Sequence, residues 1–141
     1  MTGRSRAREV VLQILYQDDL NPDADPKAIE DFMRQRLKNN SQLMDFARSL
    51  LSGVRRNRQE LDSMLARCAA NWSLERMAVT DRNVIRLGAY EMLYTNTPAP
   101  VVIDEAVELA KRFGAKQSAQ FVNGVLDRFL HDWLPDRGES K

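Results

Sequence analysis

Cysteine and histidine are almost absent from this sequence, which contains one of each, Cys68 and His131. A lone cysteine cannot form an intrachain disulfide, which is typical of proteins of the reducing cytoplasm. Nothing in the pattern indicates a Cys–His nucleophilic pair, and one histidine cannot supply the two Glu-x-x-His motifs of a di-metal helical bundle. The sequence also lacks a Walker loop and a GxGxxG motif. We therefore expect no enzymatic activity, no cofactor and no metal site.

An excess of charge of either sign is missing too. Lys and Arg number 21 against 20 Asp and Glu, a net charge of +1, so any contact with nucleic acid must come from local patches. A tight, strongly salt-dependent RNA complex formed by this chain alone is not expected. No apolar run approaches the roughly 20 residues of a transmembrane helix. The apolar run after the first arginines is interrupted by Gln13, so it does not resemble the apolar region of a secretory signal peptide. These absences predict a cytoplasmic protein.

Strand patterns are also nearly absent, whereas apolar residues recur at helical spacing along most of the chain. This predicts an all-α fold, a single domain over residues 1–141 with about seven helices in two packed groups that split near Asn57, and a frayed tail over 136–141. We expect helices over residues 4–19, 26–38, 41–54, 57–68, 81–94, 102–113 and 118–129. Side chains predicted to cap helix N-termini are Asp25, Ser41, Asn57 with Glu60, and Thr80.

Other residues are predicted to shape the connections and helix contacts. Trp72 and Leu74 are expected to fill the connection before the fifth helix with apolar side chains. Gly114 is expected to end the sixth helix in a left-handed cap. Three glycines lie inside predicted helices, where each costs about 1 kcal/mol relative to alanine, and we expect them to let a second helix approach. They are Gly53, Gly88 and Gly124. For Gly124 a second interpretation is that an RNA backbone comes near.

The N-terminal helix begins with arginines that precede any acidic residue. Its buried stripe is expected to consist of Ala7, Val10, Val11, Ile14 and Leu15. Arg6, Glu9, Gln13 and Tyr16 fall together on the opposite side. Arginines supply phosphate contacts, and aromatic or amide side chains beside them supply base contacts. The RNA-binding residues predicted here are Arg4, Arg6, Arg8, Gln13 and Tyr16. The alternative is a basic tail that is only solubilising.

A second candidate surface lies where the last two long helices meet. Val102, Ala106, Leu109, Ala110 and Phe113 should face inward on the first of them, and Val122, Val125, Leu126 and Phe129 on the second. The residues left on or near the open side suit stacking and hydrogen bonding to an unpaired base. Those we predict to bind RNA are Lys111, Lys116, Gln117, Ser118, Phe121, Asn123 and Arg128. The alternative is that Phe121 belongs to the core and the polar residues are merely solvated.

Several blocks of this sequence, in order along the chain, resemble the NusB family of transcription antitermination factors. The blocks are Arg4-x-Arg6-Ala7-Arg8-Glu9, Gln13-x-Leu15-Tyr16, Val84-x-Arg86-Leu87, Ala89-Tyr90-Glu91, Asp104-Glu105-Ala106-x-Glu108-Leu109-Ala110-Lys111, Phe113-Gly114-Ala115 and Phe121-Val122-Asn123-Gly124-Val125-Leu126-Asp127. The last block is long and specific. The chain departs from the family pattern at Ser5, which breaks the arginine run, and in the loop Ala115–Ala119.

The resemblance implies a function. Members of this family join the ribosomal protein NusE, bind a short single-stranded boxA element in ribosomal RNA leader transcripts, and suppress premature termination as part of the RNA polymerase antitermination complex. The charge balance agrees with the need for a partner, because a few arginines offer too few phosphate contacts for tight binding. We place the partner contact around Glu75, Arg76, Asp81 and Arg86, whose charges precede and open the central helix. They could equally be ordinary surface charges.

Other interpretations remain open. Similar helical domains precede the catalytic domain of ribosomal RNA cytosine methyltransferases, although 141 residues leave no room for a cofactor-binding domain. A protein-only helical scaffold is the third interpretation, favoured by the near-zero net charge. Self-association through the face of the N-terminal helix would mask Arg6, Gln13 and Tyr16.

Overall fold

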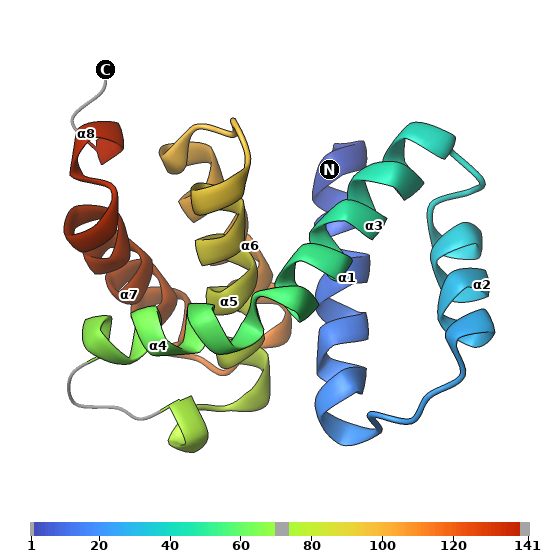
Figure 1. Ribbon diagram of the computed structural model, residues 1–141, viewed down its shortest axis with the longest axis horizontal. Coiled ribbons are helices and arrows are strands. Elements are labelled where there is room, and N and C mark those ends of the chain that lie inside the picture. The colour runs from blue at the N-terminus through green and yellow to red at the C-terminus, as the bar shows by residue number, and fades with distance from the viewer. Residues whose placement is uncertain (1, 70–73, 139–141) are drawn as a thin grey trace.

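The computed structural model describes residues 2–69 and 74–138, which form α-helices joined by short loops (Figure 1). The elements in chain order are α1 (Gly3–Leu20), α2 (Pro26–Arg36), α3 (Ser41–Arg56), α4 (Arg58–Cys68), the 3-10 helix η1 (Leu74–Arg76), α5 (Val79–Tyr94), α6 (Ala99–Phe113), α7 (Ser118–Trp133) and α8 (Pro135–Gly138). Over the described ranges there is no β-strand. The all-α prediction is confirmed, except that part of the tail expected to fray belongs to α8. Trp72 lies outside the described residues.

The helices form the two groups that the sequence predicts. In Figure 1, α1, α2 and α3 lie on one side and α4 to α7 on the other, and α3 passes into α4 at Asn57. The helix that joins the groups is α5, which contacts α1 and α3 as well as α4, α6 and α7. Every residue of α5 from Asn83 to Met92 is buried, as expected for a helix that is apolar on more than half of its circumference.

The apolar stripes account for most of the core. Val102, Leu126 and Phe129 are buried, as predicted. Phe113 is the exception. It is the last residue of α6, and its ring is 36% exposed because the stripe runs out at the helix end.

Side chains cap the N-termini of both α2 and α3. The prediction for α2 is confirmed, since the Asp25 side chain accepts a hydrogen bond from the Lys27 amide. The prediction for α3 is wrong by one residue. Asn40 caps this helix by accepting a hydrogen bond of 3.0 Å from the Leu43 amide, and Ser41 is the first helical residue.

The predicted caps of α4 and α5 are wrong. Asn57 is the C-cap residue of α3, and its side-chain amide donates a hydrogen bond of 2.8 Å to the carbonyl oxygen of Gly53 in the last turn of that helix. Glu60 does not reach back to Asn57 but accepts a hydrogen bond from the Tyr94 hydroxyl. Thr80 lies inside α5, which begins one residue earlier and has no side-chain cap.

The glycines mark close contacts, but not in the way predicted for Gly114. This residue has φ −96° and ψ −171°, which is extended rather than left-handed. A Cβ there would lie 2.5 Å from Ser118 Oγ, so the side chain is excluded by packing. The predicted close approach is confirmed at Gly53, where a Cβ would meet the Tyr90 ring at 2.1 Å, and at Gly88. Gly124 faces open space, with no atom within 4 Å of a built Cβ.

Candidate nucleic-acid interface

The first two arginines of α1 are on the surface. Arg4 and Arg6 are exposed, and no described acidic side chain forms an ion pair with Arg6. The guanidinium carbon of Arg4 lies 4.3 Å from the centroid of the Phe46 ring of α3. This cation–π contact holds one cation at a fixed place on the surface, while Arg6 stays available for a phosphate.

Arg8, predicted to contact RNA, is instead a structural residue. Its side chain is 5% exposed, Nε donates to Glu91 at 2.9 Å, and Nη1 lies 3.4 Å from a Glu105 carboxylate oxygen. Burial by itself lowers the pKa of Arg8, but the hydrogen bonds and charges of Glu91 and Glu105 raise it above the ordinary value. The guanidinium therefore stays charged and ties α1 to α5 and α6.

Further along the same face of α1, Gln13 and Tyr16 open onto a hollow. This hollow of about 260 Å³ is lined by Leu12, Gln13, Tyr16, Thr80 and Phe113, and we call it the Tyr16 hollow. Tyr16 is 40% exposed and Phe113 is 36% exposed. The side-chain oxygen of Gln13 is buried without a hydrogen-bond partner among the described residues, which is uncommon for a buried polar atom.

A second hollow lies beside the start of α7. It has a volume of about 380 Å³ and is lined by Arg76, Met77, Ala78, Asp81, Ala115, Gln117, Ser118, Gln120 and Phe121. We call it the Phe121 hollow. Phe121 is half-buried, so part of its ring is accessible. One carboxylate oxygen of Asp81 is buried and, within the described residues, has no hydrogen-bond partner. An aromatic ring beside a carboxylate with one unpaired oxygen suits the stacking of a base and acceptance of a hydrogen bond from its edge.

The two hollows adjoin the same chain segments. Thr80 lines the Tyr16 hollow, and the next residue, Asp81, lines the Phe121 hollow. On either side of Gly114, Phe113 lines the Tyr16 hollow and Ala115 lines the Phe121 hollow. They therefore form a strip from the middle of α1 across the start of α5 to α7. Arg6 lies on the Gln13 side of α1, about 15 Å from Tyr16 along the helix axis at 1.5 Å per residue.

The remaining residues predicted near the end of α6 and the start of α7 fall into two groups. Lys111, Lys116 and Gln117 are exposed near the strip, although Lys111 forms an ion pair of 3.4 Å with Glu108. Ser118 is buried, and its hydroxyl accepts a hydrogen bond of 2.8 Å from the Ala115 amide. That prediction is therefore corrected, because Ser118 fixes the loop.

Two predicted residues lie further along α7. Arg128 is exposed and paired with Asp132 at 2.9 Å. It shares a helix face with Phe121 and the open Gly124, seven and four residues apart. Asn123 is exposed but lies on the other edge of the helix, since two residues rotate it by about 200° from Phe121. The structure does not bring it to the Phe121 hollow.

The predicted partner-binding residues are divided as well. Glu75 and Arg76 are exposed on η1, and Asp81 lines the Phe121 hollow. Arg86 is 3% exposed and bidentate on Asp62, with donor–acceptor distances of 2.7 and 2.9 Å. It is therefore corrected to a structural residue that joins α5 to α4.

Sequence reasoning missed Phe113, which lines the Tyr16 hollow, and the ion pair that positions it. Arg112 bonds Glu9 of α1 at 2.6 Å, and its guanidinium lies 5.3 Å from the Phe113 ring centroid. The sequence signal for this exposure was the position of Phe113 at the end of the predicted helix, where the apolar stripe stops. In the described part of the chain, no cluster of three or more His, Cys, Asp or Glu side chains could hold a metal ion, and no helix is long and apolar enough to cross a membrane.

Comparisons with known proteins agree with this architecture. The model of the NusB family matches residues 5–131. The transcription antitermination protein NusB of Anaeromyxobacter dehalogenans is 42% identical over 134 residues, which cover 95% of this chain and 94% of that protein. The structure of T. maritima NusB superposes with a TM-score of 0.85 at 36% identity and covers 99% of both chains. A chain in the crystal structure of antitermination factors NusB and NusE with double-stranded RNA shares the fold, with a TM-score of 0.78 at 23% identity over 94% of this chain and 99% of that one.

Proposed function

This chain belongs to the NusB family, and we propose that it is an RNA-binding transcription antitermination factor. Together with the ribosomal protein NusE it binds boxA-type RNA in ribosomal RNA leader transcripts and suppresses premature termination by RNA polymerase. It acts in the cytoplasm, by binding rather than by catalysis.

One observation carries the assignment of the site. The strip brings residues from α1, α5 and α7 to neighbouring hollows, with an accessible aromatic ring and an unused buried oxygen in each. We assign phosphate contacts to Arg4, Arg6 and Lys116 and stacking on a base to Phe121. Unpaired bases splayed onto aromatic side chains are the usual basis of sequence-specific RNA recognition.

We place the partner contact beside the RNA contact. Arg76 and Asp81, expected to bind NusE, line the same hollow as Gln117 and Phe121, expected to bind RNA. We therefore propose that RNA and NusE meet at the Phe121 hollow, so that each completes the surface that the other binds. With a net charge of only +1, the chain depends on the second subunit for tight binding.

A paired titration tests this function. NusE is titrated into the protein with and without boxA RNA, and RNA is titrated with and without NusE. Linkage requires the same enhancement factor in both directions, and we expect about a fivefold to 150-fold enhancement, the usual range of coupling between sites. Equal affinities with and without the second ligand would favour a passive scaffold. Failure of both ligands to bind would refute the function.

A further inference from the structure

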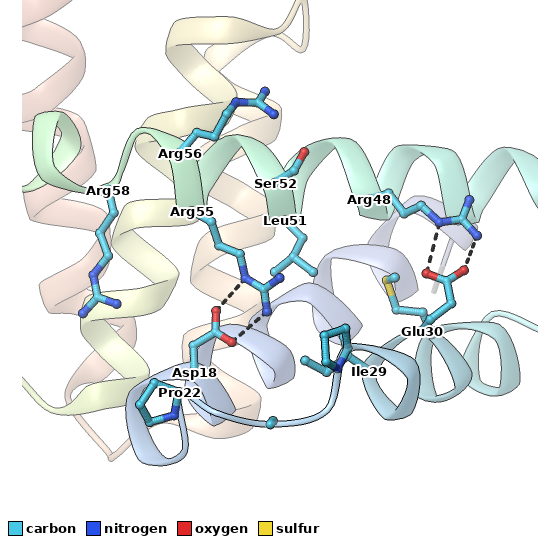
Figure 2. Close-up of a pocket in the computed structure, with 13 residues that line it drawn as sticks. Asp18, Pro22, Ile29, Glu30, Arg48, Leu51, Ser52, Arg55, Arg56 and Arg58 are labelled. Carbon is cyan, nitrogen blue, oxygen red and sulfur yellow. Dashed lines mark hydrogen bonds and ion pairs between the residues drawn. The ribbon is translucent and has the colours of Figure 1, made fainter.

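A third hollow lies on the far side of the N-terminal group, between α2 and α3. It has a volume of about 710 Å³ and is walled by the end of α1, the loop after it, α2, α3 and the first residue of α4 (Figure 2). It shares no residue with the two hollows of the strip. We call it the α2–α3 groove. Its volume is in the range of sites that enclose ligands.

The groove combines an apolar floor with a rim of arginines. Pro22, Pro26, Ile29, Met33 and Leu51 supply the apolar surface. Arg48, Arg55, Arg56 and Arg58 lie along its α3–α4 side, with Arg56 directed away from the floor (Figure 2). Figure 2 shows Arg55 paired with Asp18 across the middle of the groove and Arg48 paired with Glu30 at one end.

Positive charge is in excess at the other end. Arg56 is exposed and forms no ion pair with a described acidic side chain. Arg58 pairs with Asp19 at 2.9 Å, but the Asp19 carboxylate also lies 3.1 Å from Arg82 and 3.8 Å from Arg86. The Asp19 carboxylate is thus shared between Arg58 and Arg82, while Arg86 is paired mainly with Asp62, so the charge of Arg58 is only partly compensated. This end of the groove is suited to an additional anion.

We propose that the α2–α3 groove is a docking site for an acidic peptide segment of a partner protein. The segment places an aliphatic side chain on the floor formed by Pro22, Ile29 and Leu51. It directs one carboxylate to Arg58 and a second past the rim to Arg56, which points away from the floor (Figure 2). An RNA strand is the less suitable occupant, because no aromatic side chain lines the groove and unpaired bases need such rings for stacking.

The mobility expected of α2 supports insertion of a peptide. Met33 is the only residue of α2 that is buried among those described. The main contacts of this helix are with α1 and α3. Elements with few buried apolar contacts open locally at low cost. The α2 wall can therefore move outward to admit a side chain while the rest of the fold stays intact.

Selection from a random peptide display library tests the proposal. The full chain is the target, and the double variant Arg56→Glu/Arg58→Glu is the counter-target. We expect the enriched peptides to carry Asp or Glu beside an aliphatic residue. A labelled enriched peptide should lose about tenfold or more in affinity for the double variant, and a smaller factor for Arg56→Gln, which removes a single exposed charge.

The matched control is Lys38→Glu/Arg67→Glu, which changes net charge equally at exposed positions outside the groove. It should bind the enriched peptide within about twofold of the parent. Circular dichroism verifies that each variant is folded. Enrichment without an acidic pattern, equal losses in both double variants, or a loss of affinity for single-stranded RNA confined to the groove variant would each overturn the proposal.

Discussion

The guanidinium of Arg8 and the carboxylate of Glu91 form a buried bidentate ion pair between residues 83 positions apart. The pair joins the arginine-bearing end of α1 to the central helix. It also separates the three N-terminal arginines by role, because Arg8 holds the helix while Arg4 and Arg6 remain at the surface. This division gives the first prediction.

Replacing Arg8 with Ala should destabilise the protein by about 3–5 kcal/mol, because it leaves Glu91 buried without its partner. Urea unfolding measures the loss. Glu91→Gln should also destabilise, whereas Lys111→Ala, at an exposed pair, should change stability by at most about 1 kcal/mol. A fully stable Arg8→Ala variant that has lost RNA affinity would show that Arg8 contacts RNA after all.

Arg6→Ala should weaken RNA binding for every sequence tested and leave stability unchanged. The side chain is exposed and positioned to contact a phosphate, and each phosphate contact adds about one to the slope of log affinity against log salt. Affinity measured over a salt series should therefore show a slope reduced by about one. An unchanged slope would exclude Arg6 from the phosphate contacts.

Phe121→Ala should reduce RNA affinity by about 1–3 kcal/mol, the usual contribution of a ring that stacks on a base. The ring is only half-buried, so the variant should remain folded. Phe129→Ala is the contrasting change, because this buried ring belongs to the core and its loss should cost about 3–5 kcal/mol of stability. If Phe121→Ala unfolds the protein, its role is in the core.

Two Gly-to-Ala changes inside helices should have opposite effects. Gly53→Ala places a Cβ against the Tyr90 ring and should destabilise the protein by about 1–3 kcal/mol through overpacking. Gly124→Ala meets nothing and should stabilise it by up to about 1 kcal/mol through helix propensity. Thermal unfolding compares the two variants. If an RNA backbone passes Gly124, the stabilised variant should nevertheless bind RNA more weakly.

Asp19 should make the protein less stable in acid. Burial raises its pKa, but hydrogen bonds from Asn83 and Arg82 outweigh this and hold the pKa below its ordinary value of 3.8. A carboxyl with a lowered pKa contributes stability above its unfolded-state pKa and loses that contribution as pH falls through the folded-state value. In urea unfolding, the stability difference between the parent and Asp19→Asn should therefore shrink below about pH 4. A stability difference for Asp19→Asn that stays constant with pH would refute the assignment.

Local sequence accounts for the helices because each apolar stripe repeats within a few residues. It does not separate neighbouring cap candidates, since Asn40 and Ser41 both have capping side chains and tertiary packing decides where α3 begins. Thr80 is a similar case. The N-cap position of α5 is Ala78, so the helix begins at Val79 and Thr80 lies inside it.

The structural arginines were harder to predict, since their partners are distant in sequence. A signal was nevertheless present. At 100° per residue, Arg8 falls between Leu15 and Leu12, both of which are buried, and Arg86 falls between Leu93 and Tyr90. An arginine within an apolar arc predicts a buried ion pair. The hollows of the strip had no comparable signal, because they form where several helices that are distant in sequence pack together.

The ion pair between Arg8 and Glu91 also means that α1 can be anchored to the central helix only after α5 has been synthesised. Helix α1 has no acidic residue in its first turn and no basic residue in its last, so its charges oppose the helix dipole and do little to stabilise it alone. At about 5–20 residues per second, Glu91 leaves the ribosome's catalytic centre roughly 4–17 seconds after Arg8. A nascent chain that has not yet reached α5 thus carries its arginines on an unanchored segment. The arrangement that we propose for RNA binding forms only once most of the molecule has been translated.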